Sequence, residues 1–390
     1  MKSRKFFILM ILSLLIASLA CNLPLPEETP DVPPSEEIPP VEDTTSPVEE
    51  PTETATTEPP SSSIVTYSSA TFEVHTLDGT LLESRPAPGL ANWARPNQSQ
   101  VVGDNIYYVD SAGSSLGGMV KRVTPAGVED LAFTSAPVLA ALTFAVSPDG
   151  SKIAWGFAEW ANSSLMVADI NGANMVIAQQ SSPDDAFDDF FVLETVQWID
   201  NDNLIYSWQI SGIGNLLYFG YSTLLKYTLS TATTQELVSL ASGYSAPCWS
   251  AVSEDGTIAL GTCDPGGSMS GMREHNLVSS AETVFPTLPG QQQTGAASFA
   301  PAAGRIAYCF GERNAADQII GSVAVRMNSG EDPAILAAAP SGYFTGSLWA
   351  NESILLLEGA QDSTQQVYQL TMAGALTPFV EGQLIGLMEP

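Results

Sequence analysis

An internal repeat is the feature of this sequence that most constrains its fold. A short turn followed by an aliphatic residue recurs six times, and the aliphatic positions are 47 to 54 residues apart. One copy of the turn is Ser147-Pro148-Asp149-Gly150. A period of this length indicates an array of similar supersecondary units. The aliphatic positions are Ile106, Ile153, Leu204, Ile258, Ile306 and Ile354.

A second hairpin-like segment recurs seven times. Asp78-Gly79 separates two strand-like runs in the first copy, and Asn171-Gly172 does so in the third. Such dipeptides favour the positive φ angles of tight hairpin turns. The two hairpins together predict a unit of four antiparallel strands. The seven copies span residues 72–82, 119–131, 165–177, 224–238, 274–285, 323–336 and 367–379.

Four-stranded units of this length are typical of β-propeller blades, whose faces are both covered by neighbouring blades. We therefore predict an all-β fold, a β-propeller of seven four-stranded blades in residues 64–390. The first hairpin has one copy fewer than the second, so the N-terminal unit lacks partner strands. We expect Ser63–Tyr67 and Gln383–Met388 to supply them. Pairing of the N- and C-terminal strands would close the ring and remove its open sheet edge.

One copy of the repeat carries a resemblance to a known family. The segment from Phe144 through Ser147-Pro148-Asp149-Gly150 to Trp155 resembles the WD40-like repeat of TolB-type propellers. Pro148 suits the second position of the turn, and Gly150 suits its left-handed position. The resemblance implies the fold of residues 64–390 and carries no active site with it.

The N-terminus has the pattern of an export signal. Three basic residues precede an apolar run from Phe6 to Ala20, which is shorter than the roughly 20 residues of a membrane-spanning helix. Residues 1–20 are predicted to be a signal peptide that is cleaved before Cys21. The cysteine resembles that of the bacterial lipoprotein box. This implies that Cys21 is lipidated and anchors the exported protein to a membrane, facing the periplasm or the cell exterior.

Residues 21–63 are predicted to be a disordered stalk between the lipid and the propeller. The segment is rich in Pro, Glu and Thr, and it holds eleven acidic residues but no Lys, Arg or aromatic residue. Such a chain cannot bury a core, and its prolines and like charges extend it. The whole chain has 43 acidic and 13 basic residues, a net charge of −30. That balance argues against a nucleic-acid partner, which a basic surface would bind.

Binding is expected on one face of the ring. The turns within hairpins share one face, whereas the long connections Gln179–Glu194, Gln209–Thr223, Cys263–Met272 and Gly311–Gly321 share the other. Long connections in compact domains are often functional. The aromatic candidates for ligand binding there are Trp160, Phe187, Phe190, Tyr218, Phe219 and Tyr221.

A group of aspartates leaves the question of a metal open. Its carboxylates could hold Ca²⁺, but the loop has no fixed calcium-binding pattern, and a solvated acidic loop is the alternative. No other cofactor is expected, because the sequence has only two histidines and neither has the spacing of a zinc site. The aspartates are Asp184, Asp185, Asp188 and Asp189.

Two functions are compatible with these residues. The first is a surface-tethered, non-catalytic propeller that binds a protein or a cell-envelope component through its long-loop face. The second is a glycan-binding or glycan-processing protein that uses the acidic and aromatic residues of that face, since paired carboxylates can hydrolyse glycosidic bonds. The absence of a usable histidine or metal motif in the sequence favours the non-catalytic reading.

Three cysteines follow Cys21. Cys248 and Cys263 flank Asp255-Gly256 symmetrically, so a two-residue loop there would set them opposite each other and allow a disulfide. A three-residue loop would place them on opposite faces of the sheet. The alternative is three buried thiols, and Cys309 is expected to be buried in either case.

Overall fold

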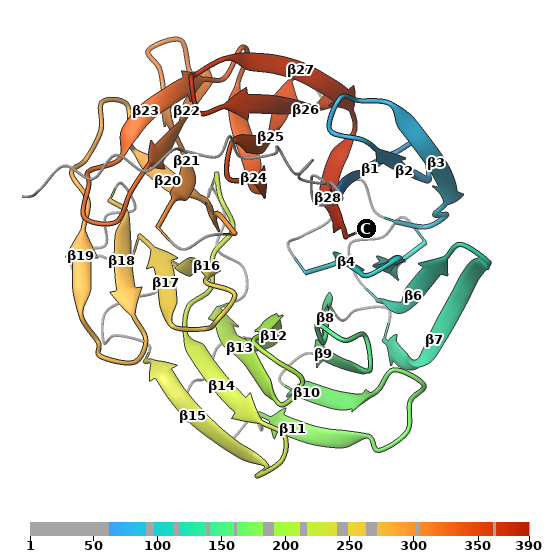
Figure 1. Cartoon of the computed structure of the whole chain (residues 1–390). Helices are drawn as coiled ribbons and strands as arrows, with labels where there is room; N and C mark the ends of the chain where they lie inside the picture. Colours follow the sequence, from blue (N-terminus) through green and yellow to red (C-terminus); the bar gives the residue numbers. More distant parts are fainter. Residues whose placement is uncertain are drawn as a thin grey trace, which may run out of the picture. The chain divides into compact units, whose positions relative to one another are not determined.

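The structure is a computed structural model (Figure 1). It describes residues 62–90, 97–112, 117–137, 141–159, 162–181, 191–210, 217–239, 249–262, 271–301, 304–361 and 364–389. The described strands form seven separate four-stranded sheets arranged in a ring, so the predicted seven-bladed propeller is confirmed.

Blades 1 to 4 come from the N-terminal half of the ring and from the last strand of the chain. We number the blades in chain order. Blade 1 contains β28 (Gln383–Met388), β1 (Ser63–Ser68), β2 (Thr71–His75) and β3 (Leu81–Pro86); blade 2, β4 (Ser99–Val102), β5 (Asn105–Asp110), β6 (Gly118–Thr124) and β7 (Gly127–Ala136); blade 3, β8 (Ala141–Val146), β9 (Lys152–Glu159), β10 (Asn162–Asp169) and β11 (Val176–Gln180); blade 4, β12 (Phe191–Trp198), β13 (Asn203–Ile210), β14 (Leu224–Thr228) and β15 (Thr233–Val238).

Blades 5 to 7 complete the ring, and in every blade the first-named strand lies nearest the axis (Figure 1). Blade 5 contains β16 (Trp249–Val252), β17 (Ile258–Gly261), β18 (Arg273–Asn276) and β19 (Glu282–Val284); blade 6, β20 (Gln293–Phe299), β21 (Ile306–Arg313), β22 (Ile319–Arg326) and β23 (Ala334–Ala338); blade 7, β24 (Tyr343–Asn351), β25 (Ile354–Gln361), β26 (Thr364–Thr371) and β27 (Leu376–Glu381).

The two ends of the propeller pair in blade 1. β28 is the innermost strand and runs antiparallel to β1, with Ser63 opposite Met388 and Ile64 opposite Leu387. The predicted closure of the ring by Ser63–Tyr67 and Gln383–Met388 is therefore confirmed. Blade 1 is therefore built from the first three strands of the propeller and its last strand.

Consecutive residues of the second strand in a blade face opposite neighbours. In β5, Ile106 and Tyr108 pack toward blade 1, whereas Tyr107 and Val109 pack toward blade 3. All four are at most 3% exposed. This burial on both faces explains why apolar residues form runs here instead of alternating with polar ones. Among the described residues, seven such clusters follow one another around the ring, one at each seam between blades.

Side chains also hydrogen-bond across every seam. Gln100 of blade 2 donates to the carbonyl of Val146 in blade 3 at 3.1 Å and accepts from its amide at 2.8 Å. At the seam between blades 7 and 1, the amide of Leu384 donates to Glu358 Oε2 at 2.9 Å. These bonds pair backbone groups that the sheets leave over. The other five seams use Arg85, Thr143, Gln197, Ser250 and Ser347.

No helix among the described residues has the length and apolar character needed to cross a membrane.

Candidate functional site

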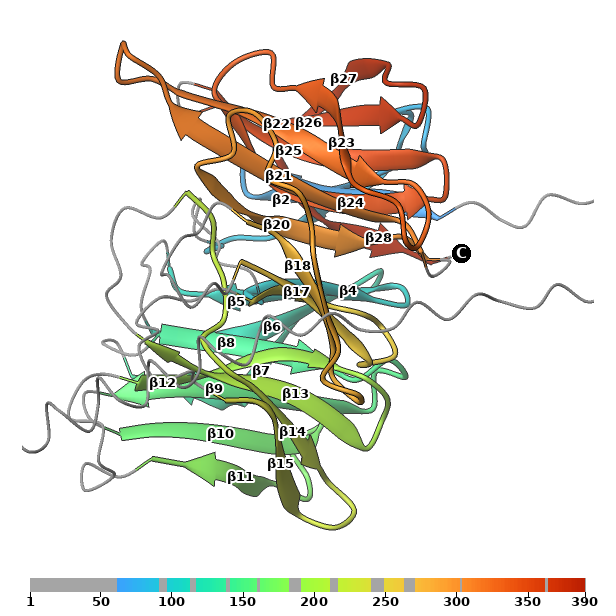
Figure 2. The same ribbon diagram turned by 90° about the vertical axis from the view of Figure 1, so that its left-hand side faces the viewer.

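The ring has two faces that differ in how the chain turns. The short-turn face carries the turns between the first and second and between the third and fourth strands of each blade, such as Ser147–Lys152. The long-loop face carries the links between second and third strands and between blades. Figure 2 shows the ring edge-on, with β28 ending at the short-turn face on the right.

Aspartates on the short-turn face form hydrogen bonds within their own turns. Asp149 Oδ1 accepts from the Ser147 hydroxyl at 2.7 Å and from the Ser151 amide at 2.9 Å, and Asp255 repeats the pattern with Ser253 and Thr257. These hydrogen bonds lower the pKa of both carboxyls, for Asp149 chiefly through the Ser151 amide and for Asp255 chiefly through the Ser253 hydroxyl. The two copies of the repeat therefore share one turn geometry, although only the first has proline.

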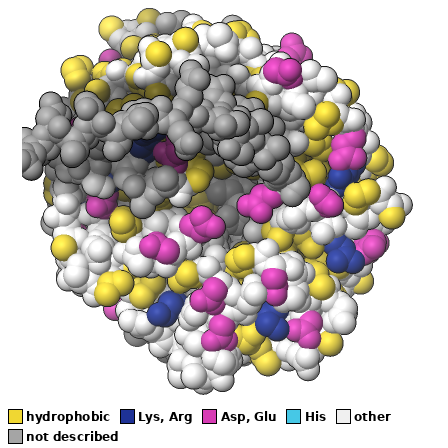
Figure 3. Space-filling view, viewed as in Figure 1, with side chains coloured by type: hydrophobic (Ala, Val, Ile, Leu, Met, Phe, Trp, Pro, Cys, Tyr) yellow, Lys and Arg dark blue, Asp and Glu magenta, His cyan; other side chains and the backbone are white. Residues whose placement is uncertain are grey.

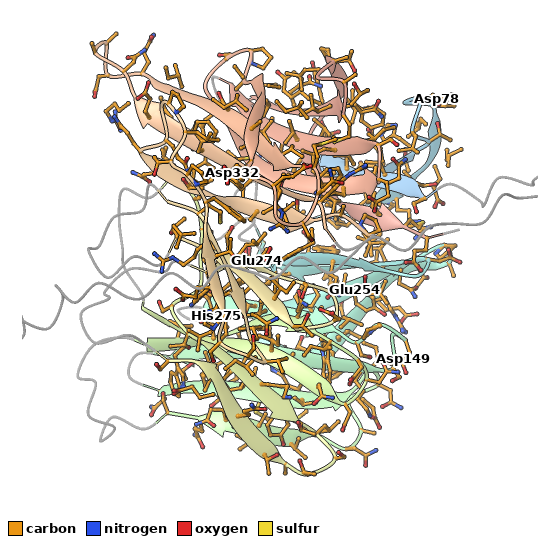
Figure 4. The ribbon with its side chains drawn as sticks, turned by 60° about the vertical axis from the view of Figure 1, so that its left-hand side comes forward. Asp78, Asp149, Glu254, Glu274, His275 and Asp332 are labelled. Atoms are coloured by element: carbon orange, nitrogen blue, oxygen red, sulfur yellow. The ribbon has the colours of Figure 1, made fainter. Side chains whose placement is uncertain are left out.

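Some other charged side chains on this face form local ion pairs. Figure 3 shows carboxylates scattered around the short-turn face, several with a basic side chain beside them. Lys152 Nζ lies 3.0 Å from Asp169 Oδ1, and Arg305 Nη1 lies 3.6 Å from Glu352 Oε2. Figure 4 places Asp78 and Asp149 at hairpin tips along this edge of the ring. The composition of this face is thus largely set by turn geometry.

Most of the predicted site residues lie outside the described residues. Lipidation of Cys21, the disulfide and ligand binding by the aromatic residues named here stay predictions, as does the calcium site. The described part of the chain holds no group of three or more His, Cys, Asp or Glu side chains that could bind a metal ion. The residues outside it are Cys21, Trp160, Asp184, Asp185, Phe187, Asp188, Asp189, Phe190, Cys248 and Cys263.

The other predicted aromatic residues lie in one segment, Leu217–Tyr221, which we call the strap. It precedes β14 of blade 4, yet it extends to blade 6. In Figure 1 the yellow-green trace before β14 runs past β16 toward β20, and Figure 2 shows the same course. The amide of Leu217 donates to Oε1 of Gln293 on β20 at 2.8 Å. The strap therefore joins blades that are not neighbours.

Tyr218 packs between blades 6 and 7. Its ring contacts that of Tyr343 edge-on at 6.0 Å between centroids, and it belongs to the buried cluster that contains Cys309 and Phe344. Burial raises the pKa of Tyr218 well above its ordinary value. Its hydroxyl is buried and has no hydrogen-bond partner among the described residues. The described contacts of the Tyr218 side chain are apolar. A phenylalanine ring would therefore fit this position better than the phenol of tyrosine.

Tyr221 ties the other end of the strap to blade 5. It exchanges two backbone hydrogen bonds with Trp249, at 2.7 and 2.9 Å. Its hydroxyl accepts from the side-chain amide of Asn97, which also donates to the carbonyl of Thr195 on β12. Burial, and secondly the charge of Glu194, raise the pKa of Tyr221. The strap thus contacts blades 4 to 7 and the segment that leads into blade 2.

Two of these rings are enclosed by protein. Tyr218 and Tyr221 are each 5% exposed, and Phe219 is half-buried with its ring 5.4 Å from that of Tyr221. Their role in ligand binding stays a prediction. Sequence analysis did not foresee that the strap crosses to blade 6, because the residues that make room for it, Gly295 and Gly311, lie more than 70 positions away along the chain and show no local pattern.

One expected long connection is wrong. Gly311–Gly321 continues the strands β21 and β22, with Gly311 opposite Gly321 and Arg313 opposite Ile319. A tight turn closes the hairpin, with the Asn314 amide donating to the Gln318 carbonyl at 2.9 Å. The glycines were interpreted as loop residues, but they lie within the ladder, where a neighbouring element approaches closely.

The loop between β16 and β17 differs from both sequence alternatives. Ser253 and Ile258 close it, so it contains four residues. The strands first keep the register of a two-residue loop, with Ala251 opposite Leu260, and a bulge then sets Trp249 opposite Gly261. Cys309 is buried, as expected, and is a free thiol; burial raises the pKa of that thiol.

Both histidines contact carboxylates within their own blades. His75 Nε2 lies 3.3 Å from Glu73, and His275 Nδ1 lies 3.0 Å from Glu282, which also pairs with Arg273 at 3.2 Å. Figure 4 places His275 within blade 5, away from the hairpin tips. Glu73 and His75 are two positions apart on β2, and His275 lies opposite Glu282 on the neighbouring strand. Side-chain pairs of this kind stabilise a sheet locally.

No protein-family model and no curated protein matches the sequence. Solved structures do match. A prolyl endopeptidase aligns with a TM-score of 0.49 and 16% identity over 74% of this chain and 42% of that one, so this chain spans less than half of its length. TolB from Acinetobacter baumannii aligns with a TM-score of 0.46 and 14% identity over 84% of this chain and 80% of that one.

A chain of a mitotic checkpoint complex aligns with a TM-score of 0.50 and 12% identity over 89% of this chain and 91% of that one. Proteins with such different roles share this architecture at low identity. The similarity therefore concerns the fold alone: the chain is a seven-bladed propeller that resembles TolB and other propellers in structure.

Proposed function

We propose that this protein is a non-catalytic binding propeller that is exported and held at a membrane by a lipid on Cys21. Its long-loop face binds a protein or a component of the cell envelope. The stalk, which begins at Cys21 and ends before β1, sets the propeller at a distance from the membrane, because a chain rich in proline and like charges is extended.

The observation that carries this proposal is the contrast between the two faces. On the short-turn face, the carboxylates of Asp149 and Asp255 already accept hydrogen bonds from their own turns. A substitution there to suit a partner would disturb the turn. The long-loop face carries longer connections, and one described segment of it, the strap, reaches from blade 4 to contact Gln293 of blade 6 and Tyr343 of blade 7.

The reading as a binding protein is tested by offering the full-length protein to a glycan array and, in parallel, to a panel of glycoside substrates. Saturable binding without turnover supports it. Turnover that is lost when a single carboxylate of the long-loop face is replaced by its amide would contradict it and favour the glycan-processing alternative.

The anchor is tested separately, by fractionating cells that express the wild-type protein or Cys21→Ser. We expect the variant to leave the membrane fraction while its propeller stays folded. Intact mass measurement gives the direct readout, because an unmodified Cys21 in the membrane-bound wild-type protein would refute the lipid anchor.

A further inference from the structure

We propose that the strap is a latch. It occupies a seat for an aromatic side chain on blades 6 and 7, and a partner segment carrying an aliphatic residue followed by an aromatic one takes that seat when the latch opens. The claim about the partner rests on the proposed function, whereas the latch and the seat are properties of this chain alone.

The seat exists because three positions in blade 6 have no side chain. A Cβ atom at Gly295 would lie 2.3 Å from Cβ of Tyr218, and one at Gly311 would lie 3.3 Å from Cδ1 of Leu217. At Gly321 a Cβ would lie 2.6 Å from that of Tyr343, the residue that forms the side of the seat. None of the three has a positive φ angle. These glycines therefore provide space for a neighbour and serve no turn.

The seat recognises an aromatic ring and does not satisfy a hydroxyl. Val323, Phe344 and Cys309 of its cluster are not exposed, and Tyr343 meets the ring of Tyr218 edge-on. Within the part of the chain that the structure describes, the Tyr218 hydroxyl has no hydrogen-bond partner. A buried, unpaired hydroxyl costs free energy. A strap with phenylalanine at position 218 would therefore occupy the seat more tightly than the native strap does, so the native residue is not the best occupant of the seat.

The strap is attached in a way that permits local release. At Tyr221 it is fixed by backbone bonds to Trp249. At Leu217 the described contacts are the hydrogen bond to the side chain of Gln293 and apolar packing, and Leu217 belongs to none of the described strand ladders. Blades 6 and 7 keep their own sheets and their own seam contacts, including the bond of 2.7 Å between the Ser298 and Ser347 hydroxyls. The Leu217 end can therefore leave while the ring stays closed.

Cys309 reports directly on this opening. It lies opposite Gly295 in the ladder between β20 and β21, so its side chain is on the same face of the sheet as Tyr218. The thiol is 0% exposed when the latch is closed. Removal of the Tyr218 ring would uncover it to a thiol reagent.

The experiment measures alkylation of Cys309 in the full-length protein, with peptide mass mapping to separate it from the other cysteines. Tyr218→Ala is compared with Phe72→Ala, a buried aromatic between blades 1 and 2 that serves as the matched control for lost stability. Each variant is assayed the same number of degrees below its own melting temperature, so that global unfolding contributes equally. Under these conditions we expect Cys309 to be alkylated at least about tenfold faster in Tyr218→Ala than in the control. If Tyr218→Ala fails to fold, Tyr218→Leu replaces it.

A peptide of residues 215–223 added in trans tests the seat itself. It should slow alkylation of Cys309 in Tyr218→Ala. A peptide with phenylalanine at position 218 should do so at least as well, and one with alanine there should not. Equal alkylation in Tyr218→Ala and Phe72→Ala, or no protection by the peptide, would overturn the proposal. Neither result depends on a partner, so failure of the proposed function would be seen separately.

Discussion

Removal of β28 tests whether the two ends of the sequence close the ring. A chain that ends at Gly382 loses five strand pairs with β1, the buried side chain of Met388 and the half-buried Leu384, Ile385 and Leu387. Hydrogen bonds contribute about 1 kcal/mol each, and a fully buried aliphatic side chain contributes about 1.5 to 3 kcal/mol. The loss is then on the order of 5 kcal/mol or more, comparable with the whole stability of many domains.

We expect the shortened protein to melt at least about 10 °C lower, or to aggregate through the exposed edge of β1. Thermal unfolding followed by circular dichroism, with light scattering for aggregation, gives the measurement. A chain that ends at Glu389 is the matched control, because it keeps all of β28. A protein ending at Gly382 that stays monomeric and melts within about 2 °C of the control would refute the closure.

Three further predictions follow from individual side chains. Tyr218→Phe should leave the free energy of unfolding unchanged or raise it, because the hydroxyl is unpaired, whereas Tyr218→Ala should lower it by about 3 to 5 kcal/mol; denaturant unfolding checks both, and a loss above about 1 kcal/mol for phenylalanine would show a hidden partner. Burial raises the pKa of Glu358 above its ordinary 4.5, so this group ionises at a lower pH in the unfolded chain than in the folded one. The free energy of unfolding of the wild type should therefore fall, relative to that of Glu358→Gln, as the pH rises above 4.5. A difference between the two proteins that stays constant from pH 4 to 8 would contradict this. Asp149→Ala should cost about 1 kcal/mol at neutral pH, and the difference should shrink as the pH falls below 3.8 and through the lowered pKa of Asp149. A cost that does not decrease at any pH below 3.8 at which both proteins stay folded would show that the carboxylate is not the cause.

The architecture was predictable because each repeat carries the same kinds of turn residue followed by an aliphatic residue. Short turns recur every 47 to 54 residues, and an extra copy of the second hairpin indicated that Gln383–Met388 must close the ring. The bulge between Trp249 and Ala251 was not predictable, since local sequence does not fix the register of a short strand. The hairpin Gly311–Gly321 was misread because glycine signals both loops and close approach.

The candidate site was less predictable than the fold. Sequence analysis placed Tyr218 and Tyr221 on the long-loop face from their position in the repeat, but it could not show that the chain folds back across the ring. The contacts that bury them come from Gly295, Tyr343 and Asn97, which are distant in sequence. Tertiary contacts of this kind leave no periodic pattern, so only the structure reveals them.

The most direct test of the central claim is a binding measurement with matched variants on the two faces. Full-length wild-type protein, a Trp160→Ala/Phe187→Ala variant of the long-loop face and Pro148→Ala on the short-turn face are titrated against isolated cell-envelope fractions, with folding checked by circular dichroism. We predict that the long-loop variant binds at least about tenfold more weakly, because aromatic anchors carry much of the affinity of an interface, while Pro148→Ala binds as the wild type does. Normal binding by the long-loop variant together with loss of binding in folded Pro148→Ala would contradict the account.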